Sequence, residues 1–161
     1  MRQKKQQRKE APKMLGEYFP LFIDLSGKRI LVVGAGKIAI RRVRTLCSFT
    51  QDILVIAPEI HGAIREYERA GKICCMQKRF EDTDLAGRDL VLAVTDDPEV
   101  NVHIWEQCKR QGILVNVADQ KELCDFYFPG IVRKEGAVIG ISSSGKNPGK
   151  VKELRRKIER I

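Results

Sequence analysis

The sequence contains no long apolar run. A helix that crosses a membrane needs about 20 predominantly apolar residues, and polar or charged side chains interrupt every stretch of that length in these 161 residues. The residues that follow Met1 are polar and basic, unlike the hydrophobic region of an export signal. We therefore expect no membrane partner and a cytoplasmic location.

Metal-ligating residues are also scarce. The chain has two histidines, His61 and His103, and neither lies beside a second ligand in the sequence. Its five cysteines are an odd number without a C-x-x-C spacing, which fits reduced thiols better than disulfides or a zinc site. We predict no resident metal.

Positive charge is concentrated at the two ends of the chain. The formal net charge is +9, yet the body between residues 13 and 146 carries 17 basic and 18 acidic side chains. Nucleic-acid binding through the basic ends is the weaker interpretation, because no aromatic side chains are interleaved with them. The same ends can attract a small anionic substrate by raising its local concentration.

Strand and helix signals alternate along most of the sequence. We expect a disordered basic extension over residues 1–17, one domain over residues 18–145, and the start of a C-terminal helical region over residues 146–161. Apolar segments predict five strands, at residues 29–33, 52–57, 73–77, 89–94 and 113–117, with helices in most gaps. This alternation is typical of an α/β fold with a mainly parallel sheet.

The first predicted strand runs into a glycine-spaced turn. Gly34 and Gly36 begin a G-x-G-x-x-A sequence, in which the first glycine permits a tight turn and the second lets the backbone approach phosphate oxygens. The following helix offers its unpaired N–H groups to the anion. The pattern predicts a Rossmann-like domain that binds a dinucleotide; the alternative is a glycine turn without a ligand.

Polar residues follow the other strands of the predicted sheet. Pro58 and Glu59 come after the second strand, Thr95 after the fourth and Asp119 after the fifth, so they line one edge. We expect Glu59 to lie toward the ribose of a bound dinucleotide and Thr95 to lie at the same cofactor edge. Asp119 is either a proton acceptor for hydride transfer or a residue that caps a turn.

The last third of the chain has a different pattern. Residues 126–132 and 137–141 predict a β-hairpin or a reversed pair that extends the sheet, with its turn near Glu135 and Gly136. Ser142 and Ser143 follow and offer hydroxyl groups, either to substrate carboxylates or to a polar loop. An amphipathic helix then opens at Pro148, and its apolar stripe is suited to core or dimer packing.

Several of these motifs resemble, in the same order, those of the precorrin-2 dehydrogenases of siroheme synthesis, a family that includes some ferrochelatases. The resemblance covers residue 18 to the end of the chain. It is carried by Tyr18-Phe19-Pro20-Leu21-Phe22, Gly34-Ala35-Gly36-Lys37-Ile38-Ala39, Thr95-Asp96-Asp97-Pro98, Asn116-Val117-Ala118-Asp119, Phe128-Pro129 and Ser142-Ser143-Ser144-Gly145-Lys146-Asn147-Pro148.

The resemblance implies oxidation of precorrin-2 to sirohydrochlorin with NAD as the hydride acceptor. It also implies cofactor contacts at Lys37, Ile38, Pro58 and Glu59. It implies that Asp119 is the central catalytic residue, and that Asn116, Ser142 and Ser143 lie near the tetrapyrrole, with Ser143 at a position phosphorylated in some relatives. The chain resembles compact, dehydrogenase-only forms, since longer members continue into a dimerisation region; a homodimer is possible. Iron insertion into sirohydrochlorin, or NAD(H) sensing without catalysis, are the alternative functions.

Overall fold

The computed structural model describes residues 19–161, so the basic extension expected over residues 1–17 lies outside the described residues. The fold divides into two compact units. One spans Phe22–Phe128, and the other contains Pro129–Ile161. The sequence had suggested one domain up to residue 145; here the hairpin groups with the last helix instead, because their contacts are with each other.

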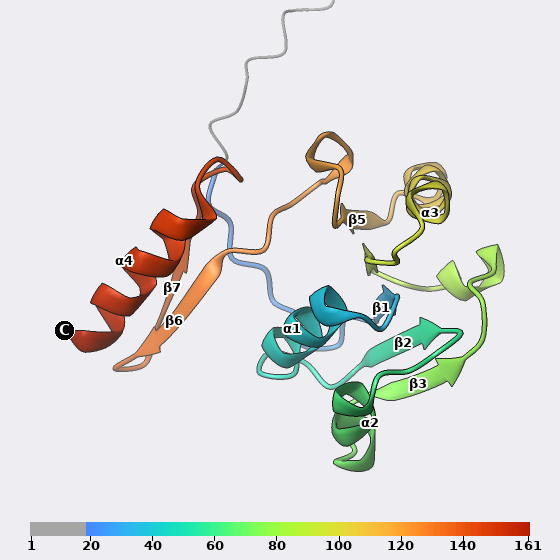
Figure 1. The fold of residues 1–161 in the computed structure, drawn as a ribbon, viewed down its shortest axis with the longest axis horizontal. Helices are drawn as coiled ribbons and strands as arrows, with labels where there is room; N and C mark the ends of the chain where they lie inside the picture. The colour runs from blue at the N-terminus through green and yellow to red at the C-terminus, as the bar shows by residue number, and fades with distance from the viewer. Residues whose placement is uncertain (1–18) are drawn as a thin grey trace, which may run out of the picture. The chain divides into compact units, whose positions relative to one another are not determined.

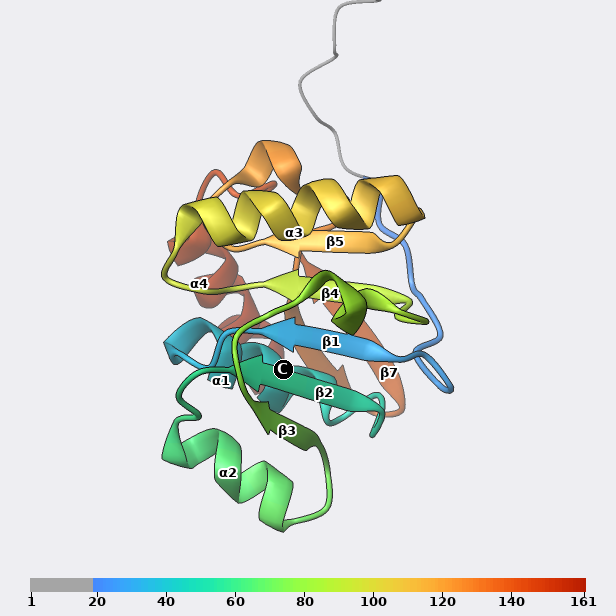
Figure 2. The same cartoon turned by 90° about the vertical axis from the view of Figure 1, so that its right-hand side faces the viewer.

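The first unit is built on a five-stranded parallel sheet. Its order is β3-β2-β1-β4-β5, and all arrowheads point the same way in Figure 2. The strands are β1 Ile30–Val33, β2 Ile53–Ala57, β3 Cys74–Gln77, β4 Leu90–Ala93 and β5 Leu114–Val117. The five predicted strands are therefore confirmed, each shorter than expected by one or two residues.

Helices cover both faces of this sheet (Figures 1 and 2). α1 Lys37–Leu46 and α2 Gly62–Arg69 pack against the side chains of Ile30 and Val32, whereas α3 Pro98–Gln111 and the short 3-10 helix η1 Asp82–Leu85 pack against Leu31 and Val33. Side chains alternate between the two faces of a strand. Because both faces are covered, all four residues of β1 are buried, which explains its unbroken apolar sequence.

Capping residues set the ends of α3. The Asp97 side chain accepts hydrogen bonds from the backbone N–H groups of Glu99 and Val100, at 2.9 and 3.3 Å, and Pro98 opens the helix. Gly112 ends it with a φ of +69°, a conformation that L side chains rarely adopt. The sequence alone predicts both ends of this helix.

The second unit consists of a hairpin and a helix. β6 Gly130–Lys134 pairs antiparallel with β7 Ala137–Ile141 through a turn in which Glu135 and Gly136 have positive φ. α4 Pro148–Arg160 packs on β6, where an added Cβ at Gly130 would come 2.8 Å from Val151. The predicted hairpin is confirmed, but its expected addition to the large sheet is wrong, since β6 and β7 form a sheet of their own.

Candidate functional site

The polar segments predicted to line one sheet edge do follow neighbouring parallel strands. Residues 34–36 follow β1, residues 58–59 follow β2, residue 95 follows β4 and residue 119 is two residues beyond β5. The chain moves from β1 toward β2 and β3 on one side and returns to β4 and β5 on the other. Ligands of open α/β sheets bind at such a reversal of strand order, beyond the carboxyl ends of the strands.

Gly34 is required by the protein itself. Its φ is +113°, and an added Cβ would lie 2.5 Å from the carbonyl oxygen of Val94. The backbone N–H of Gly34 also donates to the Ile56 carbonyl at 2.8 Å. The turn after β1 is thus held tightly against β2 and the end of β4.

No contact within the described fold requires a glycine at position 36. It is exposed, has a φ of −81° that any residue adopts, and an added Cβ would meet nothing within 4 Å. It precedes α1, whose start has neither a side-chain cap nor an acidic residue in its first turn. The diphosphate of a dinucleotide suits such a place, because it finds free N–H groups, the positive end of the helix dipole and open space above a glycine.

The neighbouring cofactor candidates differ in accessibility. Lys37, Pro58 and Glu59 are exposed, and Ile38 is partly buried against the core formed by α1 and the sheet. Lys37 is the first residue of α1, so its cationic side chain stands where phosphate charge would be placed. These four residues keep the predicted position at the edge.

The polar atoms of Thr95 make hydrogen bonds within its own loop. Its backbone N–H donates to Asn101 Oδ1 at 3.1 Å, its carbonyl accepts from Asn101 Nδ2 at 3.1 Å, and its hydroxyl lies 2.8 Å from the same Oδ1 and 2.9 Å from the Asp97 carbonyl. Thr95 therefore has few polar atoms left for a cofactor. Asn101, only 1% exposed, is the residue that fixes this loop, and the sequence analysis missed it.

Asp119 stands at the end of the β5 edge with an accessible carboxylate. It is exposed, and within residues 19–161 its side chain makes no hydrogen bond or ion pair. The preceding backbone is anchored, because the Ala118 N–H donates to the Ala93 carbonyl at 3.0 Å. A free carboxylate on an anchored backbone is available to accept a proton, and it does not cap a turn through its side chain here.

Asn116, which the resemblance places near the substrate, lies inside the fold, and its contact with a substrate stays a prediction. It is 2% exposed, and its Nδ2 donates to the Phe126 carbonyl at 2.8 Å. Cys124 lies beside it, with Sγ 3.3 Å from the N–H of Val117 and 3.1 Å from its carbonyl. These contacts fold residues 120–126 back onto β5 and so shape the loop that carries Asp119.

Arg42 of α1 is a second residue that the sequence analysis missed. Its guanidinium carbon lies 3.9 Å from the centroid of the Phe128 ring, and its Nε and Nη1 are enclosed without a hydrogen-bond partner. Desolvation lowers the Arg42 pKa to about 10, with a smaller contribution from the charge of Arg41. A charged residue three positions from buried Ala39, beside the apolar stripe of α1, was the available signal.

Ser142 and Ser143 belong to the second unit. The Ser142 hydroxyl accepts from the N–H of Ser144 at 3.1 Å, and the Ser143 hydroxyl accepts from the N–H of Asn147 at 3.0 Å. Both serines thus shape the loop between β7 and α4, as the polar-loop alternative predicts. Accepting one hydrogen bond leaves each O–H free to donate to a carboxylate.

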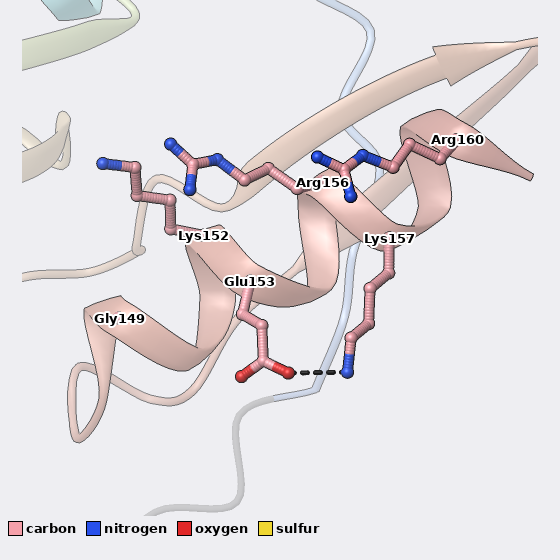
Figure 3. A pocket seen from close by; sticks show the side chains of 6 residues that line it. All are labelled: Gly149, Lys152, Glu153, Arg156, Lys157 and Arg160. Atoms are coloured by element: carbon pink, nitrogen blue, oxygen red, sulfur yellow. Dashed lines mark ion pairs between the residues drawn. The ribbon is translucent and has the colours of Figure 1, made fainter.

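A shallow hollow on α4 carries positive charge. It is lined by Gly149, Lys152, Glu153, Arg156, Lys157 and Arg160. In Figure 3 Lys152, Arg156 and Arg160 follow one another along the helix, while Glu153 pairs with Lys157 at 2.6 Å. Hydrogen bonds from Lys157 and Lys150 lower the Glu153 pKa. The spacing is that of a solvated helix face.

Residues 19–161 contain neither a metal-binding cluster nor a membrane-spanning helix. No group of three or more His, Cys, Asp or Glu side chains is arranged to hold a metal ion. No described helix has the length and apolar character needed to cross a membrane.

Comparisons with known proteins agree with this geometry. A family model for NAD(P)-binding domains matches residues 21–130. The chain is 37% identical over 145 residues to a siroheme synthase of Nitrosococcus oceani, covering 90% of this chain and 31% of that protein. It is 42% identical over 144 residues to a multifunctional siroheme biosynthesis protein of Ruminiclostridium josui, covering 89% of this chain and 28% of that protein.

A solved structure is similar over most of the chain. It is SirC, a precorrin-2 dehydrogenase, with a TM-score of 0.79 and 26% identity over 89% of this chain and 70% of that one. By contrast, the chain spans less than a third of the length of the two curated relatives.

Proposed function

The chain belongs to the NAD(P)-binding family whose model matches residues 21–130, and we propose that it oxidises precorrin-2 to sirohydrochlorin with NAD. The substrate would lose a hydride to NAD⁺ and a proton to the protein, which gives sirohydrochlorin, NADH and H⁺. The observation that carries the proposal is the accessible, unpartnered carboxylate of Asp119 at the sheet edge that also holds the glycine turn. The siroheme synthases and SirC supply the substrate class.

The residues of the first unit would hold the cofactor. Gly36 and the N–H groups at the start of α1 would receive the diphosphate, and Lys37 would add a positive charge. Pro58 and Glu59, beyond β2, would adjoin the ribose, since that strand end takes this role in dinucleotide-binding sheets. Bound NAD supplies a hydride acceptor, which no side chain of the protein can replace.

Asp119 would accept the substrate proton. A carboxylate is a suitable general base when it lies within hydrogen-bond reach of the proton that it removes. The anchored Ala118 backbone limits the positions that the carboxylate reaches, and this restriction lowers the entropy cost of the reactive geometry. Ser142 and Ser143 would donate hydroxyl hydrogen bonds to substrate carboxylates.

An Asp119→Asn variant tests this assignment. The substitution keeps the shape and removes the base, so we expect the rate of NADH formation from precorrin-2 to fall by a factor of about 100 to 10,000. NAD affinity, measured by calorimetry, should stay within about twofold of the parent. Glu122→Gln, at an exposed carboxylate in the same loop, is the matched control. Undiminished turnover in Asp119→Asn would remove Asp119 from the mechanism.

Location and assembly follow as further proposals. The five cysteines are all free thiols, as expected of a protein that works in the cytoplasm.

The stripe of α4 leaves Leu154 37% exposed and Ile161 90% exposed, which favours a homodimer packed through this helix. Sedimentation of the parent and of Leu154→Glu tests the dimer: a monomeric parent refutes it.

A further inference from the structure

Arg42 is a half-buried residue whose Nε and Nη1 are enclosed, and no carboxylate in the described part of the chain pairs with its charge. Between residues 19 and 161 no carboxylate lies within ion-pair distance of its guanidinium, and no acceptor meets Nε or Nη1. Such groups in native proteins are nearly always paired. The Phe128 ring, 3.9 Å from Cζ, offers its face to the cation but no hydrogen bond.

A second unpartnered group lies close to the same place. Asn116 Oδ1 is buried without a donor, although Nδ2 of the same amide reaches the Phe126 carbonyl at 2.8 Å. The Cys124 thiol joins the two: its Sγ lies 3.4 Å from Asn116 Nδ2, and it is near enough to Arg42 for the two groups to influence each other's pKa. One small region thus contains an unpaired cation and an unpaired acceptor.

This region adjoins the loop of the proposed catalytic aspartate. Cys124 Sγ lies 3.4 Å from the carbonyl of Gln120, the residue that follows Asp119. Of the guanidinium nitrogens, Nη2 alone is not among the enclosed, unpaired atoms, so it is the one open to a ligand. An arginine held flat against an aromatic ring presents a fixed fork to a carboxylate.

We propose that Arg42 is a substrate-binding residue that receives a carboxylate of the tetrapyrrole through Nη2. The inference rests on the proposed function, because that function supplies a substrate with many carboxylates. Partial burial of the charge without a carboxylate partner would then serve binding: the protein keeps the cation partly desolvated, and a ligand carboxylate neutralises it. The depressed pKa of Arg42, about 10, still leaves it protonated at neutral pH.

Equilibrium dialysis with sirohydrochlorin, the product of the proposed reaction, tests the proposal without turnover. We expect Arg42→Met to weaken binding by a factor of about 10 to 100, as for loss of a hydrogen bond to a charged group. Arg41→Met, which removes the exposed neighbouring charge on α1, should change it less than about twofold. Arg42→Lys keeps the charge but loses the planar guanidinium. Its affinity for sirohydrochlorin should lie between those of Arg42→Met and Arg41→Met.

Each outcome is decisive. If the parent protein fails to bind sirohydrochlorin, the proposed function is wrong; if the parent binds and Arg42→Met binds equally well, only the role of Arg42 is wrong. NAD affinity is measured in parallel, and an equal loss of NAD binding in Arg42→Met overturns the assignment to substrate. Should Arg42→Met fail to fold, unchanged sirohydrochlorin affinity in Arg42→Lys contradicts the proposal.

Discussion

Gly34 and Gly36 look alike in the sequence and differ in what requires them. Gly34 has positive φ, and a Cβ there would be 2.5 Å from the Val94 carbonyl oxygen. Gly36 has ordinary φ, and a Cβ there would enter open space. The fold therefore requires the first glycine, whereas the second is explained by the proposed cofactor site.

This difference predicts opposite outcomes for two alanine variants. Gly34→Ala should lower the free energy of unfolding by more than about 2 kcal/mol, through a backbone clash and an unfavourable φ. Gly36→Ala should unfold at nearly the parental denaturant concentration, yet bind NAD at least about tenfold more weakly, because its methyl group occupies the space proposed for the diphosphate. Chemical denaturation and calorimetry measure the two effects. Parental NAD affinity in Gly36→Ala would contradict the proposed phosphate position.

At the scale of elements, Asn101 joins the end of β4 to the start of α3. Its buried amide makes hydrogen bonds to the N–H and to the carbonyl of Thr95. Thr95 N would lie 2.9 Å from a Cβ added at Gly34, so the loop that Asn101 holds also lies against the glycine turn. Asn101 is thus a positioning residue for the cofactor site.

We expect Asn101→Ala to destabilise the protein by about 1–3 kcal/mol, since it leaves buried polar backbone groups unpaired. NAD binding should weaken as well, because the loop beside the glycine turn loses its fixed position. Glu106→Ala, on the exposed side of the same helix, should change neither property appreciably. Thermal unfolding with and without NAD measures both. Destabilisation with parental NAD affinity would limit Asn101 to a structural role.

At the scale of the whole molecule, the buried thiol of Cys108 and the half-buried thiol of Cys75 make stability depend on pH. Desolvation raises the pKa of Cys108 to about 12 and that of Cys75 to about 11, with the charge of Glu68 adding to the latter. Between about pH 9 and 10 the unfolded chain releases these protons while the folded chain keeps them. The unfolded state then binds fewer protons, so stability falls as pH rises.

The slope of this fall should approach about 1.4 kcal/mol per pH unit for each thiol. Arg42 acts in the opposite direction, but only above its own depressed pKa of about 10. Urea denaturation at several pH values with a reducing agent measures the slope, and Cys108→Ala should make it shallower. A slope that is the same in Cys108→Ala would show that Cys108 does not cause it.

Most of the fold could be predicted from local sequence. Apolar runs such as residues 30–33 give buried strands, and Asp97, Pro98 and Gly112 give the bounds of α3. The sheet to which the hairpin belongs could not be predicted, because pairing is decided by contacts between distant residues. The strand pattern of residues 130–141 is the same in either arrangement.

The candidate site was predictable only in part. Gly36, Glu59 and Asp119 follow from their positions after strands of a parallel sheet. The ligand contacts of Asn116 and Thr95 stay predictions. Their internal hydrogen bonds could not be predicted, because side-chain direction depends on the packing of residues 101 and 124–126 around them. Arg42 escaped notice because the role proposed for it comes from what it lacks, a hydrogen-bond partner for its enclosed Nε and Nη1.

The most direct test of the central claim is the stoichiometry of the reaction. Precorrin-2 and NAD⁺ are mixed anaerobically with the purified chain, and NADH and sirohydrochlorin are quantified together. Hydride transfer at the Gly36–Asp119 edge predicts that both products form in equal amounts, and that neither forms without the protein. Sirohydrochlorin without NADH, or no protein-dependent increase in either product, would contradict the account.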